Sequence, residues 1–576
     1  MIELRRRSVV AIAILLVLGG LLCAWLVSGG SSPAANNGGQ SAGVLLPGSA
    51  RLELDLIVRQ RSVALERYLA GLADPSSPLY GHYLSPAQVG QRFGIDARNA
   101  EALERELRRL GFRVLRLFPQ RNLISVSASV ATLERTFRVR LRNYRAAHVG
   151  VYHKPNRSPV LPARLERWVS GVSGLDTDLP AVPAALPDAS GGALRAVDAT
   201  SGYDIAPLAQ AAYGSDDGHG QTIGVISIGP FSLTQWQRYA TADHLPGPTP
   251  QTDVLSKPSV SSRIEGDLDL ETIHAVAPGA QIIDYETSLS DLPSAIMTIV
   301  NAHRTTIISG SFGLCDGTKR DPFQIPSGYR RAVESAFATA ALSGVTFFFA
   351  TGDTGAYACQ QNFATDKSVS VQFPSDVPYD VAVGGTVLSL NQNGAYVNET
   401  GWQDSGSNGG GGGGLNPYDA APPWEIDVQG ISTGARETPD VSAAAGDASP
   451  WWVYDGRGGS GWEPIGGTSG AAPFWAASML LVDQYMQSHG AGPLCFAAPL
   501  LYGIASESWR FSPFHDVTLG GNRYYDATPG WDFATGWGSP DVYNLATAAI
   551  AYRQAHPLPS GTSACASSLT KAVGGG

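Results

Sequence analysis

The chain has 576 residues, of which 43% are hydrophobic and 16% are charged, and it contains 67 glycines and 38 prolines. This length is too great for one ordinary domain, and the apolar content excludes an intrinsically disordered chain. Much glycine combined with little charge is typical of a loop-rich protein that mixes helices and strands.

The formal net charge of −10 hides two regions of opposite sign. Residues 41–176 hold 20 Arg and one Lys against 11 Asp and Glu, whereas residues 177–576 hold 16 Lys and Arg against 38 Asp and Glu. We expect two such regions to bind each other. The arginines of the basic region alternate with apolar residues, which is typical of solvated faces, so we expect no nucleic-acid partner. Retention on DNA at moderate salt would overturn this expectation.

The N-terminus has the pattern of an export signal. Arg5–Arg7 precede an apolar run from Val9 to Val27, and a stretch rich in Gly, Ser and Asn follows. The run is long enough to span a bilayer, so a retained membrane anchor is the alternative to a cleaved signal. We therefore expect an extracellular protein, either secreted or held at the membrane by this segment.

Five cysteines are present, and Cys23 lies in the apolar run. The other four, Cys315, Cys359, Cys495 and Cys565, have no metal-ligand spacing. In an exported chain they predict up to two disulfides, for which three pairings are possible. We prefer the pair Cys315–Cys359 because both residues flank candidate active-site loops, and free buried thiols are the alternative.

The order of predicted elements divides the chain into two folded regions. Residues 49–176 have two helix–strand repeats, which are typical of a ferredoxin-like α+β sandwich. From Tyr203 to about Ile550 buried strands alternate with helices, which predicts a parallel sheet covered by helices on both faces. In such sheets the functional groups gather at the carboxyl ends of the strands. The Pro/Ala/Gly-rich residues between the regions predict a linker.

A candidate nucleophile, Ser469, lies in the small-residue stretch Gly467–Pro473, before an apolar run that predicts a buried helix. Small neighbours let a substrate backbone approach, and a helix N-terminus favours developing negative charge. A serine in this setting can act as a nucleophile, and a plain N-cap serine before a core helix is the alternative. The whole stretch resembles the serine motif of subtilisin-like peptidases.

A base for this serine has two kinds of candidate. His274 is predicted to lie on a helix face, and no histidine has a His-Gly-Thr-His context. The acidic segment around it offers two i, i+4 carboxyl pairs, Glu265 with Asp269 and Asp267 with Glu271, each on one helix face. Two carboxylates held together cannot both ionise freely, so one pKa rises and that group can accept a proton in acid. Spacing does not choose between the pairs, and an acidic first turn stabilised by the helix dipole is the alternative.

A third candidate group is Asp353, in the tight turn that follows the buried strand 347–350. An aspartate in a turn often serves only the turn. A carboxyl group can donate a hydrogen bond to an oxyanion only when it is protonated, so a catalytic role for Asp353 would require low pH.

Several separate stretches resemble the sedolisin, or serine-carboxyl, peptidases. Residues 74–85 with Phe93 and Gly94 resemble the activation domain of pro-kumamolisin, and residues 308–313 resemble the substrate-binding strand of the family. The resemblance also covers Glu265-x-x-Leu-Asp269 with the Ala-Pro-Gly-Ala segment behind it, and residues 436–443. It implies that Ser469 is the nucleophile, Glu265 the general base, Asp269 its orienting partner and Asp353 the oxyanion stabiliser.

The resemblance also implies one bound calcium ion. Its ligands would be the side chains of Asp516 and Asp532 and the main-chain carbonyls of Val517, Thr528 and Gly530. Carboxylate and carbonyl oxygens suit a hard cation, although two aspartates in loops can equally form turns.

Two residues depart from the family pattern and leave the pH optimum open. Some relatives have tryptophan where Phe312 stands and glutamate where Ser227 stands, and both extend the proton network there.

The resemblance covers about residues 45–550 and implies an α/β, subtilisin-like fold behind an α+β ferredoxin-like prodomain. The expected organisation is a signal or anchor with a spacer at 1–43, an activation prodomain at 44–176, a linker with the processing region at 177–200, a peptidase domain at 201–555 and a tail at 556–576. We predict an exported, acid-acting endopeptidase made as a zymogen, a monomer that cleaves proteins or peptides and is inhibited by its own prodomain. The alternatives are a subtilisin-like peptidase with a histidine base and an inactive peptidase scaffold that binds proteins.

Overall fold

The computed structural model describes residues 43–146, 150–180, 182–183, 186–187, 193–209, 217–245, 247–317, 324–404, 408–426, 428–431, 433–456, 461–559 and 565. The predicted signal or anchor and most of the predicted tail lie outside these residues. None of the helices described is long and apolar enough to cross a bilayer.

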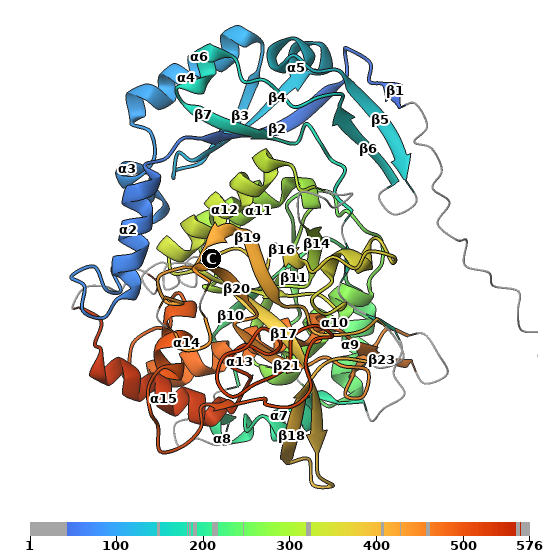
Figure 1. The fold of residues 1–576 in the computed structure, drawn as a ribbon, viewed down its shortest axis with the longest axis vertical. Coiled ribbons are helices and arrows are strands. Elements are labelled where there is room, and N and C mark those ends of the chain that lie inside the picture. The colour runs from blue at the N-terminus through green and yellow to red at the C-terminus, as the bar shows by residue number, and fades with distance from the viewer. Residues whose placement is uncertain are drawn as a thin grey trace, which may run out of the picture. The chain divides into compact units, whose positions relative to one another are not determined.

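A four-stranded antiparallel sheet forms the centre of the N-terminal region (Figure 1). Its spatial order is β3 (Arg113–Leu117), β4 (Leu123–Ser129), β2 (Arg51–Val58) and β7 (Val169–Ser173). Apolar residues of α4 (Ala97–Leu110) and α5 (Val130–Phe137) form one core with this sheet. Strand order and connections are those of a ferredoxin-like sandwich, which confirms the prediction.

Smaller elements surround this sandwich. They are β1 (Val44–Leu45), α2 (Ser62–Ala73), α3 (Pro86–Arg92), the antiparallel hairpin of β5 (Leu141–Ala146) and β6 (Gly150–Pro155), and α6 (Ala163–Glu166). Ser85 and Gln88 form a capping box that begins α3, with proline at the first helical position.

The C-terminal region has a mostly parallel sheet of eight strands among the described residues. Its spatial order is β11 (Gln251–Val254), β12 (Gln281–Glu286), β10 (Thr222–Ser227), β13 (Ile307–Gly310), β15 (Thr346–Ala350), β17 (Val381–Leu390) and β18 (Tyr396–Gly401), and β21 (Val441–Ala444) also pairs with β17. Every described pair is parallel except β17 with β18. The parallel sheet is therefore confirmed.

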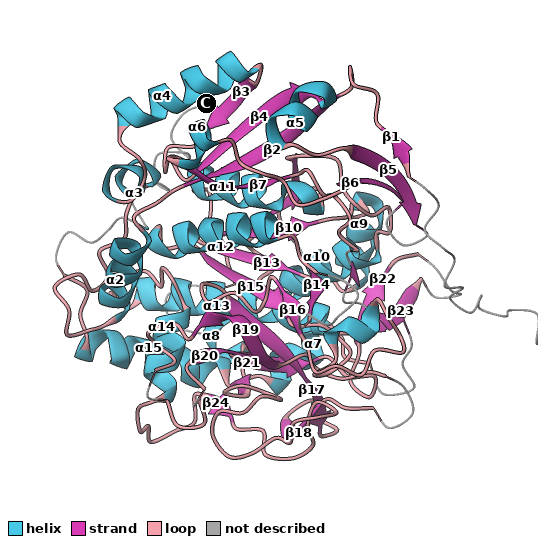
Figure 2. Cartoon of the chain, turned by 45° about the horizontal axis from the view of Figure 1, so that its top comes forward, coloured by secondary structure: helices cyan, strands magenta, loops and turns pink. Residues whose placement is uncertain are grey.

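Helices cover both faces of this sheet (Figure 2). Residues of α10 (Ile264–Val276) and α13 (Thr468–Ser488) share one core with Val225, and residues of α11 (Leu292–Ala302) and α12 (Ser327–Leu342) share another with Ile226. Neighbouring strand residues point to opposite faces, so Val225 and Ile226 mark the two sides.

The remaining elements connect the layers or lie at the edges. They are β8 (Val182–Pro183), β9 (Leu186–Pro187), α7 (Ala196–Gly202), α8 (Ala206–Ala209), α9 (Leu233–Ala242), η1 (Leu289–Asp291), β14 (Phe312–Asp316), η2 (Ala358–Gln361), β16 (Val371–Phe373), β19 (Gly414–Ala420), β20 (Ala435–Thr438), β22 (Trp451–Tyr454), β23 (Trp462–Gly466), α14 (Ala498–Ala505), β24 (Phe514–His515), β25 (Ser539–Pro540) and α15 (Val542–Ala555).

The sheet of the N-terminal region, the predicted prodomain, lies against α11 and α12 through apolar and hydrogen-bonded contacts. Ile57, Phe118 and Leu123 are part of the core that includes these two helices. The buried amide of Asn122 donates to the hydroxyl groups of Ser335 and Thr339, at 3.0 and 3.1 Å. The charge split of the sequence had suggested ionic contacts here. The described ion pairs of the prodomain instead lie within residues 101–178, for example Arg108–Glu104, Arg164–Glu106 and Lys154–Asp178.

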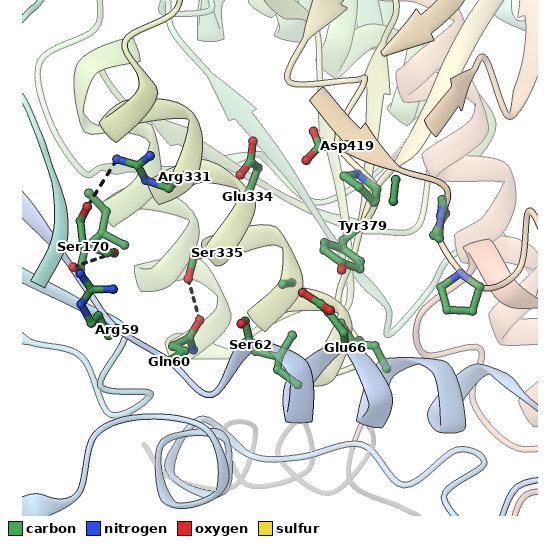
Figure 3. Close-up of a pocket in the computed structure, with 18 of the residues that line it drawn as sticks. Arg59, Gln60, Ser62, Glu66, Ser170, Arg331, Glu334, Ser335, Tyr379 and Asp419 are labelled. Atoms are coloured by element: carbon green, nitrogen blue, oxygen red, sulfur yellow. Dashed lines mark hydrogen bonds between the residues drawn. The ribbon is translucent and has the colours of Figure 1, made fainter. Parts of the chain in front are cut away.

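A cavity of about 650 Å³ opens along this interface, between α2 and α12 (Figure 3). Glu66 of the prodomain lies on one side, and Glu334, Tyr379 and Asp419 lie on the other. Burial and the charge of Asp419 raise the pKa of Glu334 to about 8. None of the lining residues is a candidate catalytic residue of the sequence analysis, so this cavity is a gap in the contact between the N-terminal region and the region that follows it.

Candidate active site

Ser469 lies in the first turn of α13 and is fully buried. Gly467 precedes the helix with φ of 129°, a conformation that residues with a side chain rarely adopt. Gly470 lies so close to Trp451 that a Cβ atom would be 2.3 Å from its ring. The small residues of this stretch are thus required by the backbone and by packing, and the predicted turn into a buried helix is confirmed.

Glu265 and Asp269 lie one turn apart on α10, and their side chains are 7% and 1% exposed. Burial raises the pKa of both carboxyl groups well above the ordinary value, and the charge of Asp269 raises that of Glu265 further. The hydroxyl group of Ser469 lowers the pKa of Glu265, as a nearby donor does. Neither Glu265 oxygen, nor the Ser469 Oγ, reaches the geometry of a regular hydrogen bond with any described residue. Two buried polar groups thus face each other without other partners.

The second carboxyl pair of α10 has other partners. Asp267 accepts a hydrogen bond from the backbone N–H of Ser232 at 2.6 Å, and Glu271 accepts one from the backbone N–H of Tyr454 at 2.8 Å. These bonds tie α10 to the N-terminus of α9 and to the end of β22. The ambiguity left by the spacing is thereby resolved in favour of Glu265 and Asp269 as the pair near Ser469.

Asp353 follows β15 and is fully buried beside the serine turn. Its Oδ1 accepts hydrogen bonds from the backbone N–H and the hydroxyl group of Thr468, at 2.7 and 2.9 Å. Its Oδ2 has no partner among the described residues. Burial raises the pKa of Asp353 to about 7, so the group is protonated in acid and Oδ2 can carry a proton to donate.

Two contacts of the site were missed by the sequence analysis. Ser311 donates from its hydroxyl group to Asp269 Oδ1 at 2.6 Å and to the backbone carbonyl of Ser469 at 3.3 Å. Thr468 joins Asp353 to the backbone N–H of Gly352, which donates to the threonine oxygen at 3.0 Å. The sequence signal for Ser311 is its place within residues 308–313, which resemble the substrate-binding strand.

His274 does not have the surroundings of a catalytic base. Its ring is fully buried and packs against Trp236 and Tyr239, with centroids 4.9 and 5.9 Å away. Burial lowers its pKa to about 4, and neither ring nitrogen has a hydrogen-bond partner among the described residues. A histidine base needs a carboxylate or carbonyl partner to orient it, so this observation counts against the histidine alternative.

Two short strands of the linker pair with elements that flank Ser469. The backbone of β8 pairs antiparallel with β14, with Pro183 opposite Phe312, and β9 pairs antiparallel with β23, with Leu186 opposite Gly466. Ser311 directly precedes β14, and β23 ends three residues before Ser469. The chain therefore approaches the serine from both sides as an extended strand. Phe312 is buried and packs edge-on against Phe349 at 5.3 Å.

The predicted calcium ligands are brought to one loop. Asp516 accepts hydrogen bonds from the backbone N–H of Gly530, at 3.2 and 3.1 Å for its two oxygens. Asp532 accepts from the backbone N–H groups of Thr528 at 2.8 Å and Ala534 at 2.8 Å. Within the described ranges, no group of three or more His, Cys, Asp or Glu side chains could hold a metal. A cation here would depend on main-chain carbonyls as well as on the two carboxylates.

Two disulfides are formed, Cys315–Cys359 and Cys495–Cys565. The first is the predicted pair, and it ties β14 to η2 near the loop of Asp353. The second holds Cys565, beyond α15, to the loop that precedes α14.

Two family models match successive parts of the chain. The family described as "Pro-kumamolisin, activation domain" matches residues 41–177, and the family described as "Subtilase family" matches residues 209–497. Sedolisin from Pseudomonas sp. (strain 101) is 30% identical over 526 residues, which cover 86% of each chain. Kumamolisin from Bacillus sp. (strain MN-32) is 31% identical over 444 residues, covering 72% of this chain and 76% of that one.

Among solved structures, Pseudomonas sedolisin in complex with two molecules of pseudo-iodotyrostatin is similar to this chain. The TM-score is 0.53 at 30% identity, and the match covers 62% of this chain and 98% of the other. The fold and these matches define a serine peptidase of the subtilase class with an activation prodomain. More particularly, the chain belongs to the sedolisin family of serine-carboxyl peptidases.

Proposed function

We propose that this protein is a secreted endopeptidase that acts in acid through Ser469, Glu265 and Asp269, with Asp353 as the oxyanion stabiliser. The observation that carries the proposal is the approach of Ser469 and Glu265: the serine hydroxyl is near enough to lower the pKa of Glu265, and neither side chain has a regular hydrogen-bond partner among the described residues. A serine next to a carboxyl group of raised pKa is what nucleophilic catalysis without histidine requires.

The reaction follows from these positions. Ser469 Oγ attacks the carbonyl carbon of the peptide bond while Glu265 accepts the serine proton. Asp269, held by Ser311, orients Glu265 and shares its charge. The oxyanion accepts a hydrogen bond from protonated Asp353, whose Oδ2 is free of other partners in the described structure. Glu265 then passes the proton to the leaving amine, and water releases the acyl group from Ser469 by the reverse sequence.

Acid pH is favoured by the protonation states that this scheme needs. Asp353 is a donor only below its pKa of about 7. The pKa values of Glu265 and Asp269 are raised, so the pair keeps a proton to share at pH values where an exposed pair would have lost both. The active form therefore disappears as the pH rises toward and above neutrality.

The linker supports an endopeptidase with an intramolecular inhibitor. A chain that pairs with β14 on one side of Ser469 and with β23 on the other occupies both sides of the scissile position. An extended strand added to a sheet edge is a usual way for a peptidase to hold its substrate. We propose that the prodomain blocks the site through this linker and that processing occurs between Pro183 and Leu186, inside the predicted processing region.

The test is cleavage of a denatured protein from acid to neutral pH by the wild type and by Glu265→Gln. We expect a maximum in acid that the variant loses, with several internal cleavage products. A maximum near neutrality that survives in Glu265→Gln would contradict the proposal. Release of tripeptides alone would replace the endopeptidase with an exopeptidase of the kind named in one relative, tripeptidyl-peptidase sed4 from Aspergillus fumigatus.

One calcium ion is part of the proposal, held by Asp516 and Asp532 with the carbonyls of Val517, Thr528 and Gly530. Both carboxylates already contact the loop that carries two of these carbonyls, which supports the ligand set. The ion would brace this loop without taking part in the reaction. We expect Ca²⁺ to raise the apparent Tm of the wild type and to have no effect on Asp516→Asn, and an equal rise in both would remove the ion from the proposal.

Secretion is supported by the two disulfides, since such bonds persist in oxidising compartments. Recovery of the mature protein from the medium with both disulfides intact is the expected result. Retention in the membrane fraction would support the anchor instead.

A further inference from the structure

A fourth buried carboxyl group, Asp284, lies on the side of the sheet that carries the catalytic pair. It belongs to β12 and has no exposed surface. Its neighbours Ile283 and Tyr285 point into the core shared with α11 and α12, whereas Ile282 points into the core shared with α10 and α13. Because strand side chains alternate, Asp284 shares the face of Ile282, which is the face covered by α10.

The carboxyl group of Asp284 has a single described partner. β10 and β12 are parallel neighbours, and the hydroxyl group of Ser227 donates to Asp284 Oδ1 at 2.6 Å. The second oxygen, Oδ2, is buried without a hydrogen-bond partner among the described residues. An ionised carboxylate would be costly in this place, whereas a protonated one can use Oδ2 as a donor.

The charges that act on Asp284 are all negative. Burial raises its pKa to about 8, Ser227 lowers it, and Glu286 on the same strand raises it. Asp269 on α10 lies close enough that an ionised Asp284 would raise its pKa. No Lys, Arg or His is among the described groups that shift either carboxyl. Asp284 is therefore neutral throughout the acid range.

We propose that Asp284 is a positioning residue of the catalytic pair: held by Ser227, it offers the proton on its Oδ2 toward Asp269 and so favours the singly ionised state of Asp269 and Glu265. This inference rests on the proposed peptidase mechanism and adds a carboxyl group behind the triad. Ser227 and Asp284 would then form the inner end of a polar chain that runs through Asp269 and Glu265 to Ser469.

The first experiment is the pH profile of kcat/KM for the wild type, Asp284→Val and Asp284→Asn. A hydrogen bond to a carboxylate lowers its pKa, so loss of the donor should move the acid limb of the profile to higher pH. We expect a shift of about one pH unit in Asp284→Val, carried by kcat with little change in KM. Asp284→Asn keeps a hydrogen-bond donor, so the acid limb of its kcat/KM profile should lie close to that of the wild type.

Two further variants separate positioning from packing. Ile282→Val is the matched control on the same strand and face, and it should leave the pH profile unchanged. Asp284→Val combined with Ser227→Glu moves the carboxyl group to the adjacent strand, β10. This double variant should return the acid limb of the kcat/KM profile to its wild-type position. An unshifted limb in Asp284→Val, or equal losses at every pH in Asp284→Val and Asp284→Asn, would show that Asp284 serves packing alone.

A second measurement does not depend on activity. In a Ser469→Ala background, which prevents self-cleavage, urea unfolding of Asp269→Asn, Asp284→Asn and the double variant gives a double-mutant cycle. We expect the effects of the two changes on unfolding free energy to be less than additive at pH 8, near the pKa of about 8 of Asp284, where about half of this group is ionised. Additive changes would overturn the link between the two carboxyl groups even in an active enzyme. If the wild type is inactive but the double-mutant cycle still shows coupling, the peptidase mechanism is contradicted and the link between Asp269 and Asp284 is not.

Discussion

Two clusters of buried carboxyl groups lie in the catalytic region, and they differ in whether a cation accompanies them. Arg436 is fully buried and bonds both oxygens of Asp440 at 2.7 Å, contacts Glu425, and lies 3.6 Å from Asp380. Around Glu265, Asp269, Asp284 and Asp353, no Lys, Arg or His is among the described groups that shift the pKa values.

The difference lies in what offsets the cost of burying a carboxyl group. Around Arg436 the cation lowers the pKa of Glu425 and Asp380, although burial still holds the pKa of Glu425 at about 8 and that of Asp380 well above its ordinary value. Around Glu265 no cation offsets burial, so these carboxyl groups depend on protons, and a proton held in a buried site is available for transfer. The protein thus buries carboxyl groups in two ways, one with a cation bonded to them and one without.

The largest expected effect comes from removing the buried cation. Arg436→Met removes the buried cation and its bonds to Asp440 and Glu425, which should cost about 3–5 kcal/mol of unfolding free energy. Urea unfolding in a Ser469→Ala background measures this. Arg304→Met, which breaks the exposed pair with Asp253, is the control and should cost less than about 1 kcal/mol. Equal costs would mean that the buried cluster is not held by its arginine.

The second prediction concerns the oxyanion donor of the cation-free cluster. Asp353→Ala should lower kcat by about 10²–10³-fold, since one donor to the oxyanion is lost. The wild-type donor has a pKa of about 7, so activity should fall as the pH rises through that value. Asp353→Asn keeps a donor that does not titrate there, so its alkaline limb should move to higher pH. An unchanged alkaline limb in Asp353→Asn would assign that limb to another group.

The smallest expected effect is a change in thermal stability, measured in one variant from each of the two clusters. The pKa of Glu265 is raised by folding, so its protonated form stabilises the protein fully below about pH 4.5, and this contribution is lost as the pH rises. Glu265→Gln should therefore raise the apparent Tm at pH 7 relative to wild type, and change it little at pH 4. Asp440→Asn, which weakens the contact with Arg436, should lower the Tm at both pH values. If Glu265→Gln and Asp440→Asn changed the Tm at pH 7 in the same direction, the distinction between the two clusters would be contradicted.

Much of the fold was predictable because the signals are local. Alternating apolar strands and helices between Thr222 and Ala350 gave the parallel sheet, and the helix–strand repeats of residues 49–176 gave the prodomain sandwich. Glycine and small residues around Ser469 predicted the turn into α13 correctly, since a tight turn and a close helix contact depend on residues next to each other in the sequence.

The hydrogen-bond partners within the candidate site were harder to predict from the sequence, because the residues that contact each other are far apart along the chain. Ser311 reaches Asp269 across 42 residues, and Thr468 reaches Asp353 across 115. Spacing alone could not choose Glu265 and Asp269 over Asp267 and Glu271. That choice came from the family motif, and in the structure the backbone partners of the second pair distinguish the two pairs. Net charge predicted that the two regions bind each other but not the kind of contact, because the described arginine ion pairs there are formed within the prodomain and the contact with α11 and α12 is apolar and hydrogen-bonded.

The pairing of β8 with β14 and of β9 with β23 has a consequence for the timing of activation. A linker joined to the enzyme that it enters has an effective concentration set by chain geometry and not by the amount of protein in solution. Maturation by cleavage of this linker would follow first-order kinetics and would proceed at the same rate after thousand-fold dilution. An enzyme released into a large volume would then switch on as promptly as one that accumulates near the cell.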